Sequence, residues 1–160
     1  MTPKQRDVVG LLLFVSLPLA VGALAGLSTA SSVGGWYRTI AKPSWNPPSW
    51  VFGPMWTLLY ASMGVAAWRV WRPAGFAAAK GALTLFFVQL AVNGLWSPIF
   101  FAWHRPDLAL VDIGILLALV AATLVAFRRH DRIAGGLFVP YLLWVAFATA
   151  LNFAIWRLSA

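Results

Sequence analysis

The sequence contains no cysteine and no glutamate, and it has only two histidines and four acidic residues. Without cysteine there is no disulfide framework, no thiolate metal site and no cysteine nucleophile. Few histidines and carboxylates leave little material for a zinc site or a paired-carboxylate mechanism, so we expect neither a metal nor catalytic acid–base residues. Charged residues make up only 10% of the chain, whereas about a quarter is usual in a soluble domain. The chain is therefore not an ordinary soluble globule.

The sequence contains several long runs of apolar residues. A helix needs about 20 mostly apolar residues to cross the hydrocarbon core of a bilayer. Five runs have about this length, and Asp112 is the only charged residue in any of them: 8–27, 50–68, 81–103, 108–127 and 133–156. Backbone groups in lipid must be satisfied within the segment, and no run alternates between polar and apolar residues. The sequence therefore predicts an all-α integral membrane protein, with residues 1–160 folded as one compact bundle of five transmembrane helices.

The basic residues predict the orientation of this bundle. Cytoplasmic loops carry an excess of lysine and arginine. The N-terminus with the second and fourth connections holds eight basic residues, and the remaining connections with the C-terminus hold four. We therefore expect the N-terminus inside and the C-terminus and first loop outside, in a bacterial type of membrane. The net charge of +8 is scattered between the spans, which suits contact with membrane lipid and argues against nucleic-acid binding.

The longest connection, residues 28–49, is rich in tryptophan and proline. It contains Trp36 and Trp45, and three prolines between residues 43 and 48 restrict its backbone. This segment should therefore be stiff and extended. Two interpretations remain open: an aromatic belt at the membrane interface, and a lid that folds back over the mouth of the bundle.

Polar and aromatic side chains recur at helical spacing inside the spans. Residues at i, i+4 and i+7 share one face of a helix. Gln89 and Asn93 should face the bundle interior, and so should Asn152, because amides are unfavourable toward lipid. With Trp56 and Trp144, these faces fit either an apolar pocket with a few hydrogen-bonding groups or a dense core held by interhelical amide hydrogen bonds. The spacing alone favours the dense core.

Three further features lie within the spans. Prolines inside three of them, Pro98 among these, each remove a backbone donor and predict kinks that open space between helices. A G-x-x-x-G motif at residues 22–26 permits close approach of helices, within the chain or in a dimer. Asp112 lies near the end of its span, where we expect it either to extend toward the membrane interface or to pair with Arg105 or His104; a proton or ligand contact is the alternative.

Several motifs, spread over nearly the whole chain and in a fixed order, resemble those of one known family. They are KPSWxPP at 42–48, PxWxLxY at 54–60, QLxxNxxWSPxFF at 89–101 and PYxxWxxFAxxLN at 140–152. With these motifs the chain resembles the translocator protein family, also called the tryptophan-rich sensory protein or peripheral-type benzodiazepine receptor family.

This resemblance implies a five-helix membrane protein, often a homodimer, in which a cavity binds porphyrins such as protoporphyrin IX. Drug-like and lipid-like molecules also bind in the family, and no cofactor is required. Phe153 stands where the animal sterol motif has tyrosine, so the resemblance does not extend to cholesterol as the natural ligand. The positions that match the family's pocket are Gly26, Thr29, Trp45, Phe52, Gly53, Trp56, Asn93, Trp96, Pro98, Trp144, Ala148 and Leu151.

Two classes of function follow from the resemblance. The first is binding of a tetrapyrrole for sensing, sequestration or transport, with Arg38 and Lys42 of the first loop facing the porphyrin propionates. The second is an enzyme-like, light-dependent breakdown of porphyrin, assisted by Trp56 and Trp144. Binding is favoured because a pocket needs no reactive group.

Overall fold

The computed structural model describes all of residues 1–160 and is entirely helical. The five long helices are α1 (Pro3–Val33), α3 (Phe52–Trp71), α5 (Lys80–Ser97), α6 (Pro106–His130) and α7 (Arg132–Ser159). The short elements are α2 (Trp36–Thr39), the 3-10 helix η1 (Ser49–Val51), α4 (Gly75–Ala78) and the π-helix η2 (Pro98–Ala102). The all-α prediction is confirmed, with seven α-helices in place of five.

Four helices are long and apolar enough to cross a membrane: α1, α5 continued by η2, α6 and α7. Helix α3 contains most of the predicted run 50–68 but is not among them. Its composition explains the difference, because tryptophan, tyrosine, glycine and proline are less hydropathic than aliphatic residues, and Arg69 lies in its last turn. Composition therefore supports four candidate spans where the sequence predicted five.

Local sequence signals explain where several helices begin. The Thr2 hydroxyl accepts a hydrogen bond from the backbone N–H of Gln5, whose side chain accepts one from the N–H of Thr2 in return; this capping box starts α1. Pro106 occupies the first position of α6, where its missing N–H costs nothing. Asp131 alone separates α6 from α7, and its carboxylate accepts from two backbone N–H groups in the first turn of α7. Helices α6 and α7 therefore form a hairpin with a one-residue connection.

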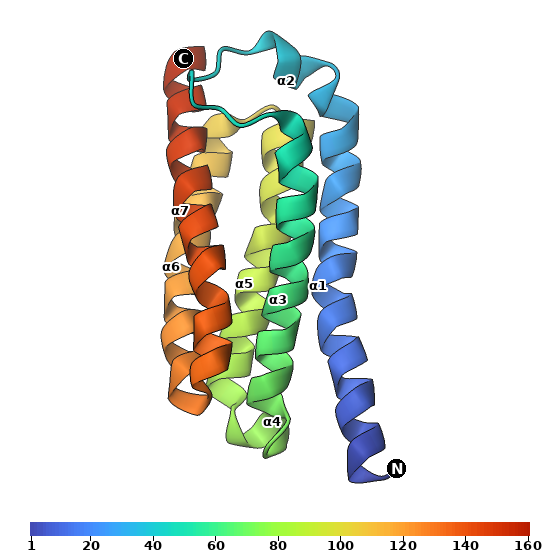
Figure 1. The fold of residues 1–160 in the computed structure, drawn as a ribbon. Helices are drawn as coiled ribbons and strands as arrows, with labels where there is room; N and C mark the ends of the chain where they lie inside the picture. Colours follow the sequence, from blue (N-terminus) through green and yellow to red (C-terminus); the bar gives the residue numbers. More distant parts are fainter.

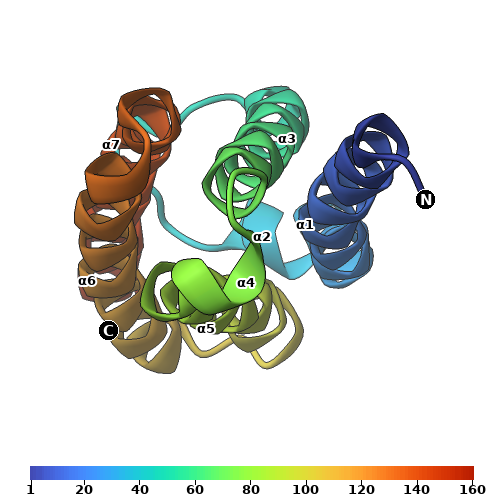
Figure 2. The same ribbon diagram turned by 90° about the horizontal axis from the view of Figure 1, so that it is seen from below.

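The long helices run side by side in one bundle (Figure 1). Helix α2 and its loop lie across the end of the bundle where the chain terminates, whereas α4 and the N-terminus lie at the opposite end. Viewed along the bundle, α6 and α7 form one side and α1 forms the opposite edge, with α3 and α5 between them (Figure 2). The edge helix α1 packs mainly on α3 and α5.

Two apolar clusters fill the bundle. The larger joins α3, α5, α6 and α7 around fully buried side chains such as Met63, Phe86 and Phe138. The smaller lies at the α2 end, where Tyr37 packs with residues of η2 and α7. The second cluster ties the first loop to the bundle.

Glycines set the contact between α1 and α3. The main chain of α1 passes so close to Gly64 of α3 that any side chain there would collide with backbone atoms. A side chain at Gly22 of α1 would likewise collide with the ring of Tyr60. Gly26, by contrast, has no atom of another residue near the place where its side chain would stand. The first glycine of the G-x-x-x-G motif therefore serves a contact within the chain, and the second faces open space.

Asp112 does not form the expected ion pair. Arg105 instead donates two hydrogen bonds to Asp107, from Nε to Oδ1 at 2.9 Å and from Nη2 to Oδ2 at 2.7 Å. The ring of His104 stacks on Trp36, with centroids 4.3 Å apart. The prediction that Asp112 pairs with Arg105 or His104 is therefore wrong, because Asp107, two residues from Arg105, holds its guanidinium by two hydrogen bonds.

Candidate functional site

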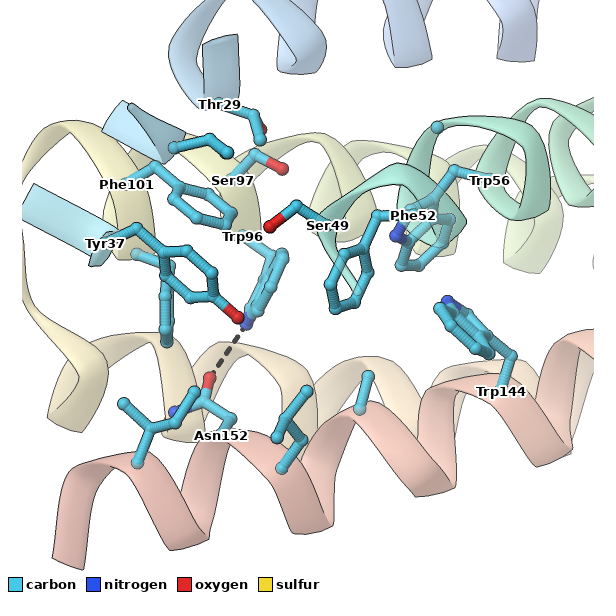
Figure 3. A pocket seen from close by; sticks show the side chains of 16 residues that line it. Thr29, Tyr37, Ser49, Phe52, Trp56, Trp96, Ser97, Phe101, Trp144 and Asn152 are labelled. Carbon is cyan, nitrogen blue, oxygen red and sulfur yellow. Dashed lines mark hydrogen bonds between the residues drawn. The ribbon is translucent and has the colours of Figure 1, made fainter. Parts of the chain in front are cut away.

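A cavity of about 130 Å³ lies inside the bundle near its α2 end (Figure 3). Hydrophobic side chains form most of its wall, and none of its lining residues is charged. The lining residues are Thr29, Val33, Tyr37, Ser49, Phe52, Gly53, Trp56, Trp96, Ser97, Phe100, Phe101, Trp144, Ala148, Leu151, Asn152 and Ile155. Such a wall suits an apolar ligand with few polar atoms.

A second cavity, of about 500 Å³, adjoins the first and is lined by α1, α3, α5 and α6. The two share Thr29, Phe52, Gly53, Trp56, Trp96 and Ser97. The other lining residues of the larger cavity are Leu19, Gly22, Ala23, Ala25, Gly26, Ala30, Thr57, Tyr60, Asn93, Ile113 and Leu116. Small-molecule sites usually have about 300–1,000 Å³, so the adjoining cavities are of a suitable size.

Aromatic rings of α3 and α7 face each other across the smaller cavity (Figure 3). The ring centroids of Trp56 and Trp144 are 6.4 Å apart, with an angle of 85° between the planes. Phe52 lies 5.9 Å from Trp144 at 65°. These edge-to-face contacts are favourable ring geometries. They leave large apolar faces exposed to the cavity.

Trp96 forms part of the wall that both cavities share, and its ring is held from two sides. Its indole Nε1 donates to Asn152 Oδ1 at 2.9 Å, and Asn152 Nδ2 donates to the backbone oxygen of Pro106 at 2.8 Å. The ring also stacks on Phe100 at 5.1 Å between centroids. These contacts join α5, η2, α6 and α7 and fix the orientation of the shared wall.

A buried polar network lies beside the larger cavity. The hydroxyl of Tyr60 donates to Asn93 Oδ1 at 2.5 Å, and Asn93 Nδ2 donates to the hydroxyl of Tyr141 at 2.7 Å. Tyr141 in turn donates to Gln89 Oε1 at 2.7 Å. The prediction that both amides face the interior is confirmed, and they link α3, α5 and α7 as interhelical hydrogen bonds. The dense core and the cavity therefore both exist, side by side.

The smaller cavity also presents polar groups that are free to meet a ligand. The Nε1 of Trp144 is buried without a hydrogen-bond partner. The hydroxyls of Ser49 and Ser97 lie in the same space (Figure 3). A buried donor without a partner is costly, so an acceptor atom on a ligand would relieve it.

The first loop packs down on the bundle. Tyr37 is only 4% exposed, and its hydroxyl donates to Asn46 Oδ1 at 3.0 Å. The ammonium of Lys42 donates to two backbone carbonyl oxygens of the loop, at 2.6 and 2.9 Å. Burial raises the pKa of the Tyr37 phenol, although the hydrogen bond to Asn46 acts in the opposite direction, so the phenol remains a neutral donor.

Some tryptophans of the loop region fit the interpretation of the loop as a lid, and another fits the interpretation as an interfacial belt. Trp36 stacks on His104, and Trp45 meets Phe147 of α7 edge to face at 5.7 Å, as a lid would. Trp50 is 75% exposed, as in an interfacial belt. The loop thus covers the end of the bundle and also presents an indole outward.

Ten of the twelve positions predicted for the pocket line one or both cavities: Gly26, Thr29, Phe52, Gly53, Trp56, Asn93, Trp96, Trp144, Ala148 and Leu151. Trp45 and Pro98 line neither. Trp45 lies on the outer side of Phe147, half exposed, and Pro98 is the first residue of the π-helix, where its missing N–H ends the regular helix α5. Binding of a ligand by these residues stays a prediction.

Some lining residues were not selected from the sequence. Phe100 is four residues after Trp96, so helical spacing places it on the same face, although it was not among the twelve predicted pocket positions. Tyr37 and Ser49 come from the loop, whose path no periodicity describes. Ile113 and Leu116 are ordinary aliphatic residues of a span and carry no signal. No group of three or more histidine and aspartate side chains lies close enough together to hold a metal ion.

Apolar helices around an uncharged, aromatic-walled cavity define a class: helical membrane proteins with a cavity inside the bundle. A sequence profile of the TspO/MBR family matches residues 14–157. The chain belongs to the TspO/MBR family, as its motifs indicated.

Relatives in this family cover most of the chain. The human translocator protein is 44% identical over 124 residues, which are 76% of this chain and 73% of the human protein. The tryptophan-rich sensory protein of Cereibacter sphaeroides is 44% identical over 92% of this chain and 91% of its own length. The tryptophan-rich protein TspO of Archaeoglobus fulgidus is 41% identical over 96% and 99%. The family match over residues 14–157 includes all the residues that line both cavities.

Proposed function

We propose that this protein binds porphyrins such as protoporphyrin IX, and related drug-like or lipid-like molecules, in the cavities between its helices. The strongest support is the arrangement of Phe52, Trp56 and Trp144, whose rings face one another across an uncharged cavity. A flat, apolar macrocycle gains stacking and burial from such faces.

The polar groups suggest how a ligand is oriented. Trp144 Nε1 offers its unpaired N–H to an acceptor atom within the ring-lined part of the site. The charged propionates of a porphyrin belong outside, because no charged side chain lines either cavity. Arg38 is exposed on α2 and is free to meet them, whereas the Lys42 ammonium is already held by two carbonyl oxygens. We therefore assign the propionates to Arg38 alone.

The biological role that fits binding is sensing, sequestration or transport. The relatives carry the names translocator protein and tryptophan-rich sensory protein, which support transport or sensing. A site with free donors and no nucleophile or metal cluster is consistent with reversible binding.

We further propose that α3 is the fifth transmembrane helix. It is 20 residues long, about the length that a span requires. It packs between α1 and α7, and three of its seven buried residues are the small residues Gly64, Ala66 and Ala67, which suits a helix that faces other helices. With five spans, the N-terminus lies inside and the C-terminus outside, and the resemblance to the family adds a homodimer.

A second candidate is light-dependent breakdown of the bound porphyrin. Trp56 and Trp144 support it, because two oxidisable indoles lie 6.4 Å apart in the wall of the same cavity. Binding shifts the absorbance of the porphyrin, whereas breakdown removes it under illumination. The same sample in darkness and in light therefore separates the two functions.

The test is titration of protoporphyrin IX into the protein in nanodiscs, in darkness, followed by tryptophan quenching and porphyrin absorbance. Trp144→Ala should weaken binding at least about tenfold, since it removes a stacking face and leaves a void. Trp50→Ala is the matched control, because Trp50 is 75% exposed and lines neither cavity. Equal affinities for wild type and a folded Trp144→Ala protein would remove Trp144 from the site, and no binding by wild type would refute the proposed function.

A further inference from the structure

Helices α1 and α3 are in close contact over only part of their length. At Gly64 and at Gly22 the two helices leave no space for a side chain. One turn beyond Gly22, a side chain added at Gly26 would contact no other residue, and the same is true of Gly53 at the start of α3. The two helices therefore separate toward the α2 end of the bundle.

The larger cavity lies where α1 and α3 separate, and residues of both helices line it there. Five small residues there both line this cavity and are exposed: Ala23, Gly26 and Ala30 on α1, and Gly53 and Thr57 on α3. We call this set the lateral window. None of its residues is charged, and the Thr57 hydroxyl is satisfied by the carbonyl oxygen of Gly53 at 2.8 Å. An apolar molecule crossing the window would thus leave no strong polar group without a partner.

The opposite route, through the α2 end, is filled by packed side chains. Tyr37 is buried among aromatic residues of η2, and Lys42 and Asn46 fasten the loop by hydrogen bonds. The stack of Trp36 on His104 adds a contact between the loop and the turn after η2. Passage at this end requires several of these contacts to break together.

Helix α1 is also the helix best suited to yield. It has the smallest buried share of the four candidate spans, and it stands at the edge of the bundle (Figure 2). Elements with few buried contacts open at the lowest free-energy cost. A small outward movement of its second half would widen the window without disturbing the contact at Gly64.

We propose that the binding cavity exchanges its ligand sideways with the bilayer, through the lateral window between α1 and α3. This inference rests on the proposed function and specifies the ligand as a molecule dissolved in membrane hydrocarbon. The macrocycle passes between Gly26 and Gly53 while its charged groups stay at headgroup level near the α2 end.

Two measurements with protoporphyrin IX in nanodiscs test the route. First, with wild type, the lipid composition is varied at one fixed aqueous porphyrin concentration, so that the amount of porphyrin dissolved per lipid changes while the aqueous concentration does not. The association rate should follow the amount of porphyrin per lipid, because the ligand arrives from the bilayer. A rate that follows the aqueous porphyrin concentration instead would overturn the proposal.

Second, the window is narrowed by Ala23→Leu with Thr57→Leu, and by the milder single change Ala30→Leu. A narrowed passage raises the barrier to uptake, so the association rate constant should fall about tenfold for the double variant. Because these residues also line the larger cavity, the equilibrium affinity is measured separately and the association rate constant decides the route. Lys42→Gln, which loosens the loop, should leave both rates unchanged.

Faster exchange in Lys42→Gln, with unchanged rates in folded window variants, would place the route at the loop and overturn the proposal. A lower affinity of the window variants with unchanged association would also overturn it, because the residues would then be ligand contacts only. Failure of wild type to bind protoporphyrin IX would instead refute the proposed function, and equilibrium titration detects that outcome separately.

Discussion

Asn152 of α7 accepts a hydrogen bond from the indole of Trp96 of α5 at 2.9 Å, and this bond orients the ring that stands between the two cavities. The same amide reaches the start of α6 through the carbonyl oxygen of Pro106. One side chain thus couples the packing of three helices to the shape of the site.

The first prediction concerns this amide. Asn152→Leu removes two hydrogen bonds and leaves the Trp96 N–H unpaired, so the free energy of unfolding should fall by about 1–3 kcal/mol. Porphyrin affinity should fall as well, because the shared wall loses its fixed orientation. Thr149→Val is a matched control on the same helix, since the Thr149 hydroxyl bonds only to the backbone of its own helix. Unfolding in detergent and porphyrin titration measure both effects, and equal behaviour of the two variants would contradict the assignment.

The second prediction distinguishes a glycine that lines a cavity from a glycine that allows two helices to touch. Gly26→Leu should leave the thermal stability unchanged, because open space surrounds Gly26, and should weaken porphyrin binding by filling the larger cavity. Gly64→Ala should do the reverse, since its methyl group would collide with the backbone of α1 near Phe14. That collision should cost about 1–3 kcal/mol. Loss of stability in Gly26→Leu would show that the cavity is closed in solution.

The third prediction concerns acid pH and the turn between α6 and α7. Partial burial disfavours the Asp131 carboxylate, but hydrogen bonds from the backbone of Ala134, the side chain of Arg69 and the backbone of Ile133 outweigh it, so its pKa is lowered. A pKa that is lower in the folded state stabilises the fold above the unfolded pKa of about 3.9, and this contribution is lost as the pH falls through the folded pKa.

Asp131→Ala should therefore lower the free energy of unfolding by about 1–2 kcal/mol at neutral pH, mostly through the lost helix cap. The partly exposed ion pair with Arg69 should contribute about 1 kcal/mol or less. The difference from wild type should shrink as the pH falls below about 3.9. Asp131→Asn keeps a capping acceptor without the charge, so its loss at neutral pH should be smaller than that of Asp131→Ala and should also shrink as wild type is protonated. A constant deficit of Asp131→Ala across the acid range would refute the linkage.

The fourth prediction concerns orientation. Single cysteines are clean reporters because the natural chain has none. An impermeant thiol reagent on intact spheroplasts should label cysteines at Ser32 and Ser159, and should not reach one at Ala74 in the connection that carries α4. Ser32 is buried, so Ser31→Cys, at an exposed neighbouring position, repeats the first measurement. Labelling at Ala74 alone would reverse the orientation.

The sequence predicted the helices and much of the site because both depend on patterns along single segments. Hydropathy predicted the long helices, and helical spacing predicted that Gln89, Asn93 and Asn152 face the bundle interior, where the structure places them. Ten of the residues that the family motifs predicted line the cavities, whereas Trp45 and Pro98 line neither; the place of Trp45 depends on how a proline-rich loop folds onto Phe147. The wall contributed by Ile113 and Leu116 was out of reach, since a cavity is a property of several helices together. The partner of Arg105 was missed for a similar reason: Asp107 competes for it at shorter range.

The one-residue connection between α6 and α7 also bears on how the protein enters its membrane. A hairpin closed by Asp131 alone brings its two apolar helices together with almost no loop to order, so its contacts are local and form early. The basic cluster around the turn, at Arg128, Arg129 and Arg132, should resist translocation, so we expect the turn on the side where synthesis occurs. The C-terminal pair can thus insert as one unit, and its two helices provide the surfaces against which α5 and α3 pack in the bundle.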